Sequence, residues 1–342
     1  ATCVTSVYLK HSLFQVVSIT GFILAGTFFP LVELRRIEEI ERVIRVYLIT
    51  GAIVSVYGII QVIRSPLPFE RAAFWIGEGV LYNHGPFAAF LGFAMGPAFV
   101  YLISEKFTVR QVPVLIAASL MTIATVVSLT RAAWVATAVL LLVFAAVRAR
   151  LFLKKMLGPL VIAVVILIPV FLNSPAAKRG MQNYWEVSTS LEYASNVERL
   201  NRWLAALRMF ADRPVTGVGP GTYEIAYEEY RSVDFTRERR GTHSEILRVA
   251  SEMGVPGVFF FSMMVIVFFR TGLRLMRHGS SPRVRRLAAG LCAGMLTYAV
   301  HGQFNEYFRT PKIAITMWVF AGMLAALERL DREGDPGPAG TA

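Results

Sequence analysis

The residue best suited to proton transfer lies in the segment Gly241–Gly257, which contains one histidine, His243. Thr242 and Glu245 have the spacing of a capping box, which predicts a helix with His243 in its first turn. The positive end of the helix dipole disfavours an imidazolium and favours a nearby phosphate, so we expect a neutral His243 able to accept a proton. A hydrogen-bonded structural histidine is the plainer alternative. Gly254 and Gly257 are expected to end this helix before the next apolar segment.

Two arginines have the chemistry to hold a phosphate. Arg131 lies between two apolar segments with almost no loop, where a charge is costly and tends to face a cavity or polar ligand. Snorkelling to the membrane interface is the alternative. Arg199 precedes Trp203 by four residues in a predicted helix that starts near Ser195, so the two side chains share one face. The planar arginine fork matches phosphate oxygens and stays charged.

Further polar groups stand where apolar segments begin or end. In the turn 301–311, Arg309 is suited to contact phosphate and Glu306 to orient a partner, but a structural turn explains them equally well. Asn83, entering another apolar segment, has the same two interpretations. The alternating glycines of 217–221 predict a tight turn or a close approach of backbone rather than a nucleotide-binding loop.

Several kinds of active site are absent from the sequence. It has no Asp-x-Asp pair, no Cys/His cluster for zinc and no Gly-x-Ser-x-Gly nucleophile motif. One histidine and several arginines remain, and a neutral histidine can take a proton from a hydroxyl. This set fits transfer of a group from a pyrophosphate-linked lipid to an alcohol, without a metal or other cofactor.

The composition predicts that the chain is a membrane protein. The 342 residues are 55% hydrophobic with a mean hydropathy of +0.53, above the about 45–50% usual for soluble domains. The net charge of +12 does not indicate nucleic acid, because the basic residues lie between apolar segments, as they do in cytoplasmic loops. The two cysteines form no disulfide framework.

We predict an all-α polytopic membrane protein with about nine transmembrane helices in this chain. The expected spans are 12–32, 43–63, 84–104, 112–130, 132–147, 156–172, 252–269, 287–304 and 312–327. If every span crosses, all basic clusters share one side, which is then cytoplasmic. Residues 34–45 are expected to form a separate amphipathic surface helix. The first span then runs inward, which implies missing upstream helices; three would give twelve in the full protein.

The chain is expected to divide at the edges of one large outer-face loop that carries short helices. Residues 1–172 hold the first six spans, 173–251 form an outer, periplasmic subdomain with the histidine motif, and 252–327 hold the last three spans. Residues 328–342 are expected to be a disordered cytoplasmic tail.

Four pieces of the sequence resemble the O-antigen ligase-like family, which includes O-antigen ligases, O-antigen polymerases and protein O-oligosaccharyltransferases. They are 128–134, similar to the family's Ser-Arg-Gly corner with Thr130 and Ala132 in place of Ser and Gly; 198–221; 243–257, which matches the ligase histidine motif in full; and 301–318. A weaker match surrounds Asn83. Together they cover roughly residues 40–327.

The resemblance implies a mechanism and a location. Undecaprenyl-pyrophosphate-linked glycan would bind with its pyrophosphate near Arg131 and Arg199, in the bacterial inner membrane with the site facing the periplasm or cell exterior. His243 would act as general base on the acceptor hydroxyl, or position it, and attack at the anomeric carbon would invert its configuration. The arginines would stabilise the charge that develops on the leaving group. Trp203, Asn83, Glu306 and Arg309 complete the expected substrate-binding set.

The sequence is compatible with more than one acceptor and with more than one class of protein. The full histidine motif favours an O-antigen ligase acting on a lipid A-core acceptor, over a polymerase or a protein O-oligosaccharyltransferase. A transporter or flippase for lipid-linked glycan predicts ionisable residues in the middle of spans, whereas the polar residues here concentrate at outer span ends. A non-enzymatic assembly protein would tolerate replacement of Arg131 and His243.

Overall fold

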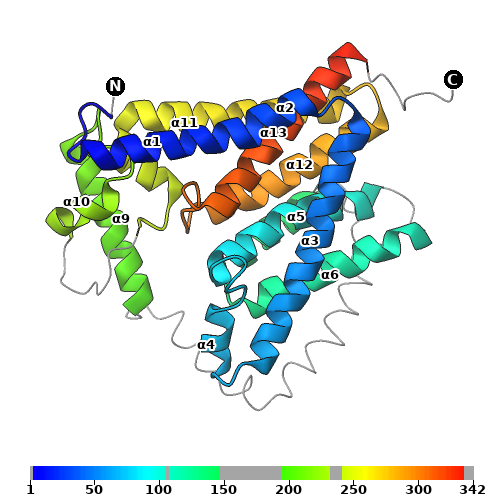
Figure 1. Cartoon of the computed structure of the whole chain (residues 1–342), viewed down its shortest axis with the longest axis horizontal. Helices are drawn as coiled ribbons and strands as arrows, with labels where there is room; N and C mark the ends of the chain where they lie inside the picture. The colour runs from blue at the N-terminus through cyan, green and yellow to red at the C-terminus, as the bar shows by residue number, and fades with distance from the viewer. Residues whose placement is uncertain (1–2, 105–107, 147–193, 232–240, 335–342) are drawn as a thin grey trace.

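The computed structural model describes residues 3–104, 108–146, 194–231 and 241–334. Every regular element within these ranges is a helix, and the long helices run back and forth between two ends of the molecule (Figure 1). The starts of α3, α6 and α12 and the ends of α5, α11 and α13 lie together at one end. The prediction of an all-α polytopic membrane protein is confirmed.

The first part of the chain forms two long rods. α1 (Leu9–Ile23) continues through a π-helical turn (Leu24–Phe28) into α2 (Phe29–Glu33), and α3 (Ile37–Arg64) follows. The expectation of a separate surface helix at 34–45 is wrong. α3 begins at Ile37 and is continuous, because its apolar face is buried against the bundle at Ile37, Ile40 and Ile44 instead of lying on the membrane surface.

The middle of the bundle is α5 (His84–Ser104), which follows the short α4 (Phe69–Phe74). It packs against α12 (Pro282–His301) through small residues: a side chain at Gly96 would overlap the backbone of Gly294, and one at Gly92 would meet Thr297. Close backbone approach at small residues is how membrane helices associate without a hydrophobic driving force. α5 is thereby enclosed on nearly all sides.

After a 3₁₀ turn (Val109–Gln111), α6 (Val112–Val127) leads to a shorter apolar helix, Arg131–Ala146. Two helices, α9 (Ala194–Asp212) and α10 (Tyr223–Tyr230), then lie at one end of the molecule (Figure 1). The bundle is completed by α11 (Glu245–His278), α12 and α13 (Pro311–Glu333).

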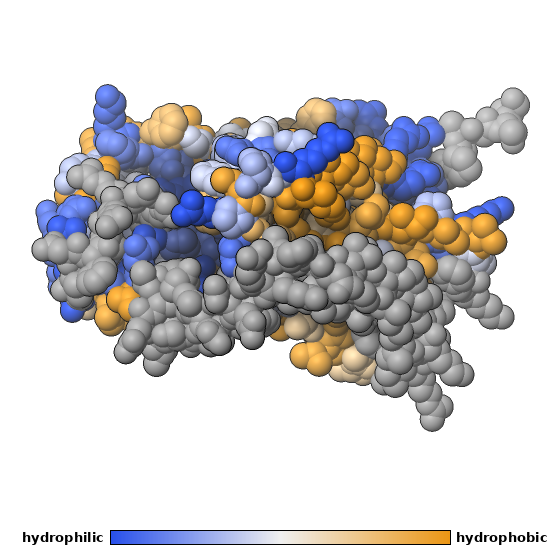
Figure 2. Space-filling view, turned by 90° about the horizontal axis from the view of Figure 1, so that it is seen from below, coloured by the Kyte–Doolittle hydropathy of each residue, from blue (hydrophilic) through white to orange (hydrophobic). Residues whose placement is uncertain are grey.

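Six helices are long and apolar enough to cross a membrane, namely Leu9–Glu33, α3, α5, Val109–Val127, α11 and α13. They correspond to six of the nine predicted spans. Two more predicted spans overlap helices: 132–147 overlaps the shorter helix Arg131–Ala146, and 287–304 overlaps the more polar α12, which ends at His301. The predicted span at 156–172 lies outside the described residues. Hydrophobic surface gathers between more hydrophilic ends (Figure 2). The count of nine is therefore not established.

The arginine-rich helix ends, called the basic end below, are tied together by ion pairs and hydrogen bonds. Arg283 of α12 binds Glu38 and, at 2.7 Å, Glu41 of α3. Arg274 of α11 pairs with Glu328, and Asp331 accepts from Ser280. Residues 328–333 are thus helical and anchored, so the expectation of a disordered tail from 328 is wrong for them; residues 335–342 lie outside the described residues.

Candidate functional site

Arg131 is positioned by the sharp corner between α6 and the next helix. Leu129 takes the left-handed conformation (φ 50°), and Thr130 then caps the helix, its carbonyl accepting from the N–H groups of Ala133 and Trp134. The Thr130 hydroxyl lies 3.1 Å from the carbonyl of His84, to which it donates, and this contact fixes the corner against the start of α5. Arg131 is therefore the first helical residue, at the end of the bundle opposite the basic end. We call this the site end.

Arg199 and Trp203 are presented by α9, as the i, i+4 spacing predicts. The other face of α9 is buried. Arg202 pairs with Glu198 at 3.3 Å, and the backbone carbonyl of Arg202 accepts a hydrogen bond from Tyr223 Oη at 2.9 Å. Asn201 donates to Tyr227 Oη. Within the described residues α9 covers Ala194–Asp212, which includes Arg199 and Trp203 as the sequence predicts. Because α10 locks one face of α9, the face with Arg199 and Trp203 turns toward the bundle.

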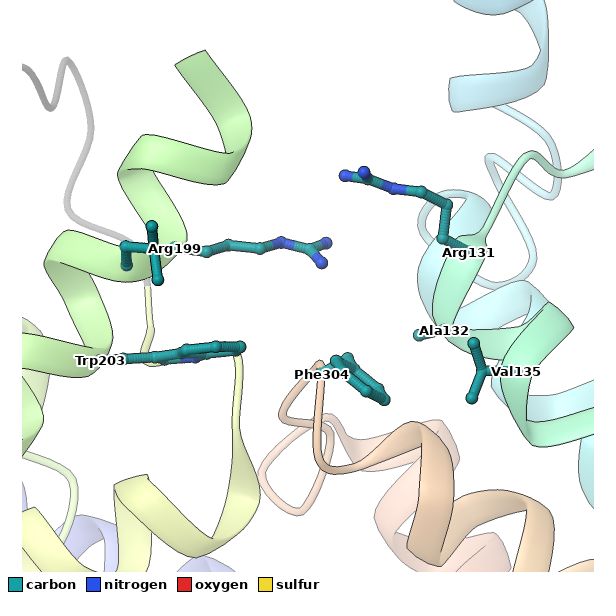
Figure 3. A pocket seen from close by; sticks show the side chains of 7 residues that line it. Arg131, Ala132, Val135, Arg199, Trp203 and Phe304 are labelled. Carbon is teal, nitrogen blue, oxygen red and sulfur yellow. The ribbon is translucent and has the colours of Figure 1, made fainter. Parts of the chain in front are cut away.

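The two arginines meet at a pocket of about 290 Å³. Its lining residues are Arg131, Ala132, Val135, Arg199, Leu200, Trp203 and Phe304. The guanidinium groups of Arg131 and Arg199 point toward one another from opposite walls, above the rings of Trp203 and Phe304 (Figure 3). The indole N–H of Trp203 is buried and, among the described residues, has no hydrogen-bond partner. The pocket thus combines two fixed positive charges with an aromatic floor.

The glycines of 217–221 are explained by close packing, as one of the two interpretations predicts. A side chain at Gly217 would overlap the backbone of Glu252, and one at Gly219 would overlap Ser6. The N–H groups of Val218 and Gly219 donate at 2.9 Å to the carbonyls of Ser251 and Glu252. This segment therefore satisfies carbonyls of α11 that would otherwise lack partners.

α11 is broken where the sequence predicts, at Gly254. That residue has φ 63° and ψ −161°, a combination nearly restricted to glycine, and Val255 N–H donates to Pro214 at 2.7 Å instead of within the helix. Residues 245–253 thus form a short outer helix that is fixed to the 214–219 segment. The longer part after the kink continues along the bundle.

The expected setting of His243 is wrong. Ser244, not Thr242, caps α11 by accepting from Leu247 N–H, and His243 lies before the helix with φ 55°, not in its first turn. The capping box fails because the Thr242 hydroxyl is used elsewhere, with Ser244 O at 2.8 Å and Glu306 Oε2 at 2.5 Å. Because His243 lies before the first turn of α11, the prediction that the helix dipole keeps its imidazole neutral loses its structural basis.

His243 adjoins the pocket through the turn 302–310. Its Nδ1 lies 3.5 Å from Oδ1 of Asn305, and Phe304, the preceding residue, lines the pocket floor. The structure thus brings Arg131, Arg199 and Trp203 around one cavity. His243 contacts Asn305, the residue that follows Phe304 of the pocket floor. His243 is not itself among the lining residues.

The turn is held by a buried ion network centred on Arg248, whose side chain is 2% exposed. Arg248 pairs with Glu245 at 2.8 Å and with Glu252 at 3.1 Å, and its Nε lies 3.9 Å from Glu306. Glu245 Oε1 accepts from Tyr298 Oη and from the N–H groups of Tyr307 and Phe308. Arg248 was not among the predicted site residues, although the spacing Glu245-x-x-Arg248-x-x-x-Glu252 places all three on one helix face. Phe304 was missed too, and no sequence signal marks it.

The other predicted site residues are engaged within the protein. Arg309 lies 3.6 Å from Glu224 and 3.7 Å from Glu252. Burial raises the pKa of Glu306 to about 7, although Arg309 and Arg248 act in the opposite direction. Asn83 Oδ1 accepts from Gly85 N–H at 3.1 Å and so caps α5. Among the described residues, no three His, Cys, Asp or Glu side chains are arranged to hold a metal ion.

A helical bundle with membrane-spanning segments and a pocket of two arginines over an aromatic floor defines a polytopic membrane protein suited to a phosphorylated, partly apolar ligand. Residues 116–262 match the family model described as O-antigen ligase. This match confirms the family resemblance: the chain carries an O-antigen ligase-like domain, of a family of glycosyltransferase-like membrane enzymes. No curated protein matches the chain.

Proposed function

We propose that the protein transfers a glycan from an undecaprenyl-pyrophosphate donor to an acceptor hydroxyl, as an O-antigen ligase acting on a lipid A-core acceptor. The observation that carries the proposal is the pocket itself, in which Arg131 and Arg199 face one another above Trp203 and Phe304. The matched region 116–262 contains Arg131, Arg199, Trp203 and His243. Three of these four residues line one cavity, although Arg131 comes from a different helix from Arg199 and Trp203.

The two arginines would bind the pyrophosphate. A diphosphate bridging the gap between opposed guanidiniums receives charge-assisted hydrogen bonds from both sides. Their charges are in place before the reaction, so they stabilise the charge that grows on the departing lipid pyrophosphate. The first sugar would lie against the ring of Trp203, which forms part of the aromatic floor.

His243 would act on the acceptor hydroxyl as general base. The bond between the anomeric carbon and the pyrophosphate oxygen breaks as the acceptor oxygen bonds to that carbon, and the hydroxyl proton passes to the imidazole. Asn305 Oδ1 beside Nδ1 favours the tautomer with the proton on Nδ1, in which Nε2 is the basic nitrogen of the ring. The internal contacts of Asn83, Glu306 and Arg309 support a role in shaping the site rather than in binding substrate.

The site would face the periplasm across the bacterial inner membrane. This assignment is supported by the basic end, where Arg274, Arg283 and Arg329 lie at helix ends far from the pocket, as cytoplasmic helix ends do.

The test is complementation of a strain that lacks its own ligase, with the natural full-length protein and three variants at matched expression. Arg131→Ala and Arg199→Ala change the pocket. Arg208→Ala removes an exposed arginine of the same α9 helix, which donates only to Tyr230 O among the described contacts, and serves as the matched control. Surface glycan is resolved on gels into free core, capped core and polymer, and lipid-linked glycan is extracted in parallel.

We expect wild type and Arg208→Ala to restore capped core, and both pocket variants to leave free core with accumulated lipid-linked polymer. Capping by both pocket variants at the wild-type level would refute the proposal. Retained capping with altered chain lengths would indicate a polymerase, and glycosylated protein with uncapped core a protein O-oligosaccharyltransferase.

A further inference from the structure

The carboxyl group of Glu306 is packed directly onto the backbone that precedes His243. Glu306 Oε2 lies 2.5 Å from Oγ1 of Thr242, one residue before the histidine. Gly241 precedes Thr242, and any side chain at Gly241 would overlap Glu306 Oε1. The absence of a side chain at position 241 therefore makes room for this carboxyl.

The Thr242 hydroxyl has two acceptors beside it and one proton to donate. Its Oγ1 lies 2.8 Å from the Ser244 carbonyl and 2.5 Å from Glu306 Oε2, and it accepts from Ser244 N–H at 3.3 Å. One proton cannot satisfy both acceptors. Both contacts are hydrogen bonds at the same time only when Glu306 carries a proton of its own and donates it to Oγ1.

The charges around Glu306 lead to the same conclusion. Two guanidiniums, Arg248 and Arg309, face two carboxylates, Glu245 and Glu252, across contacts of 2.8 to 3.7 Å. Among the described residues these four charges balance, so an ionised Glu306 would add a third buried carboxylate to this cluster. Burial raises the pKa of Glu306 to about 7, with Arg309 and Arg248 opposing the rise. The other titratable groups facing it are Tyr223 and Glu224 of α10 and Tyr307 of the turn.

The His243 backbone is strained and is held from one side. His243 has φ 55°, in the left-handed region that non-glycine residues rarely adopt. The preceding residue, Thr242, is hydrogen-bonded to Glu306. The imidazole of His243 lies against Asn305. Both contacts come from adjacent residues of the turn 302–310, and Glu245 fixes that turn through the N–H groups of Tyr307 and Phe308.

We propose that Glu306 is a positioning residue for His243: its protonated carboxyl donates to Thr242 and holds the left-handed backbone that directs the imidazole to the site. The catalytic consequence rests on the proposed function, while the structural claim does not. When Glu306 ionises at alkaline pH, the carboxylate competes with the Ser244 carbonyl for the Thr242 proton, and the His243 segment loses one of these two contacts.

The experiment follows the His243 ring by NMR of the full-length protein in lipid nanodiscs, with histidine labelled by ¹⁵N, and assigns its signal by His243→Gln. Spectra are recorded from pH 5.5 to 9 for wild type, Glu306→Gln and Gly241→Ala. Glu306→Gln stays neutral but keeps a donor, whereas Gly241→Ala displaces the carboxyl without removing it. Glu224→Gln, an exposed acid that also pairs with Arg309, is the matched control. Thermal unfolding confirms that each variant is folded.

Besides the ionisation of the imidazole itself, we expect wild type and Glu224→Gln to show a second change in the His243 signal near pH 7, where Glu306 ionises. Glu306→Gln should lack this second change. Gly241→Ala should have a displaced His243 signal at every pH and a kcat for glycan transfer lower by about 100-fold, with little change in the donor KM. A second change that persists in Glu306→Gln, or a His243 signal unaffected by Gly241→Ala, would overturn the proposal. If the NMR results hold but no variant or wild type transfers glycan, the positioning role stands and the proposed function fails.

Discussion

Glu245 and Tyr307 are joined by a hydrogen bond of 2.6 Å from the Tyr307 N–H to the Glu245 carboxylate, although 62 residues separate them. Glu245 opens α11, two residues after His243, and Tyr307 lies in the turn between α12 and α13. The same turn contributes Phe304 to the pocket and Asn305 and Glu306 to the histidine segment. The pocket floor and the histidine segment therefore contact one and the same turn, which Glu245 anchors.

Arg131 and Arg199 should act together on one ligand. Arg131→Lys and Arg199→Lys keep the charge but lose the planar fork, so we expect each to lower kcat/KM for transfer by about 10- to 100-fold. The double variant should lose less than the product of the two, because one lysine already disturbs the shared diphosphate. Steady-state assays with purified protein and lipid-linked donor measure this. Strictly multiplicative effects, or an Arg208→Lys variant as defective as either, would show that the two guanidiniums do not share a ligand.

Gly254→Ala should destabilise the protein by roughly 1–3 kcal/mol, since φ 63° and ψ −161° are strained for any residue with a side chain. The added Cβ would also lie 2.5 Å from Pro214 O. Gly21→Ala is the matched control, because a Cβ at that position on α1 meets nothing within 4 Å. Thermal unfolding in detergent compares the two. Equal stability of both variants would mean that the break in α11 does not depend on glycine.

Removing the guanidinium at the centre of the buried network should be costly. Arg248→Met leaves the carboxylates of Glu245 and Glu252 without their shared partner, and we expect a loss of about 3–5 kcal/mol in the free energy of unfolding. Arg274→Met breaks an ion pair in which Arg274 is 48% exposed, where such pairs contribute about 0–1 kcal/mol. Chemical unfolding in mixed micelles provides the comparison, and a mild effect of Arg248→Met would argue against a charged network.

Stability should depend on pH through Glu306. Burial raises its pKa in the folded state to about 7, above the ordinary value of 4.5, so the folded state binds the proton more tightly than the unfolded state. The stabilisation is fully present below pH 4.5 and is lost as pH rises through 7, by roughly 3 kcal/mol at most. Subtracting the unfolding curve of Glu306→Gln from that of wild type isolates this effect. A difference that grows with rising pH in favour of wild type would contradict the assignment.

The sequence by itself determined the class of fold and the chemistry available. Blocks of apolar residues are long enough to predict membrane helices, because length and hydrophobicity alone decide whether a helix can span a bilayer. The i, i+4 spacing of Arg199 and Trp203, the corner at Arg131 and the helix break at Gly254 were also readable, since each depends on local geometry.

Only the tertiary structure decided how these pieces meet. The Thr242–Glu245 spacing fits a capping box, but Glu306, 64 residues away, lies against the Thr242 hydroxyl, so Ser244 became the cap. Residues 34–45 look amphipathic for a membrane surface, but burial against the bundle made them the start of α3. A hydrogen bond or an apolar face can be satisfied by any neighbour, and the choice among neighbours depends on packing between segments far apart in the chain.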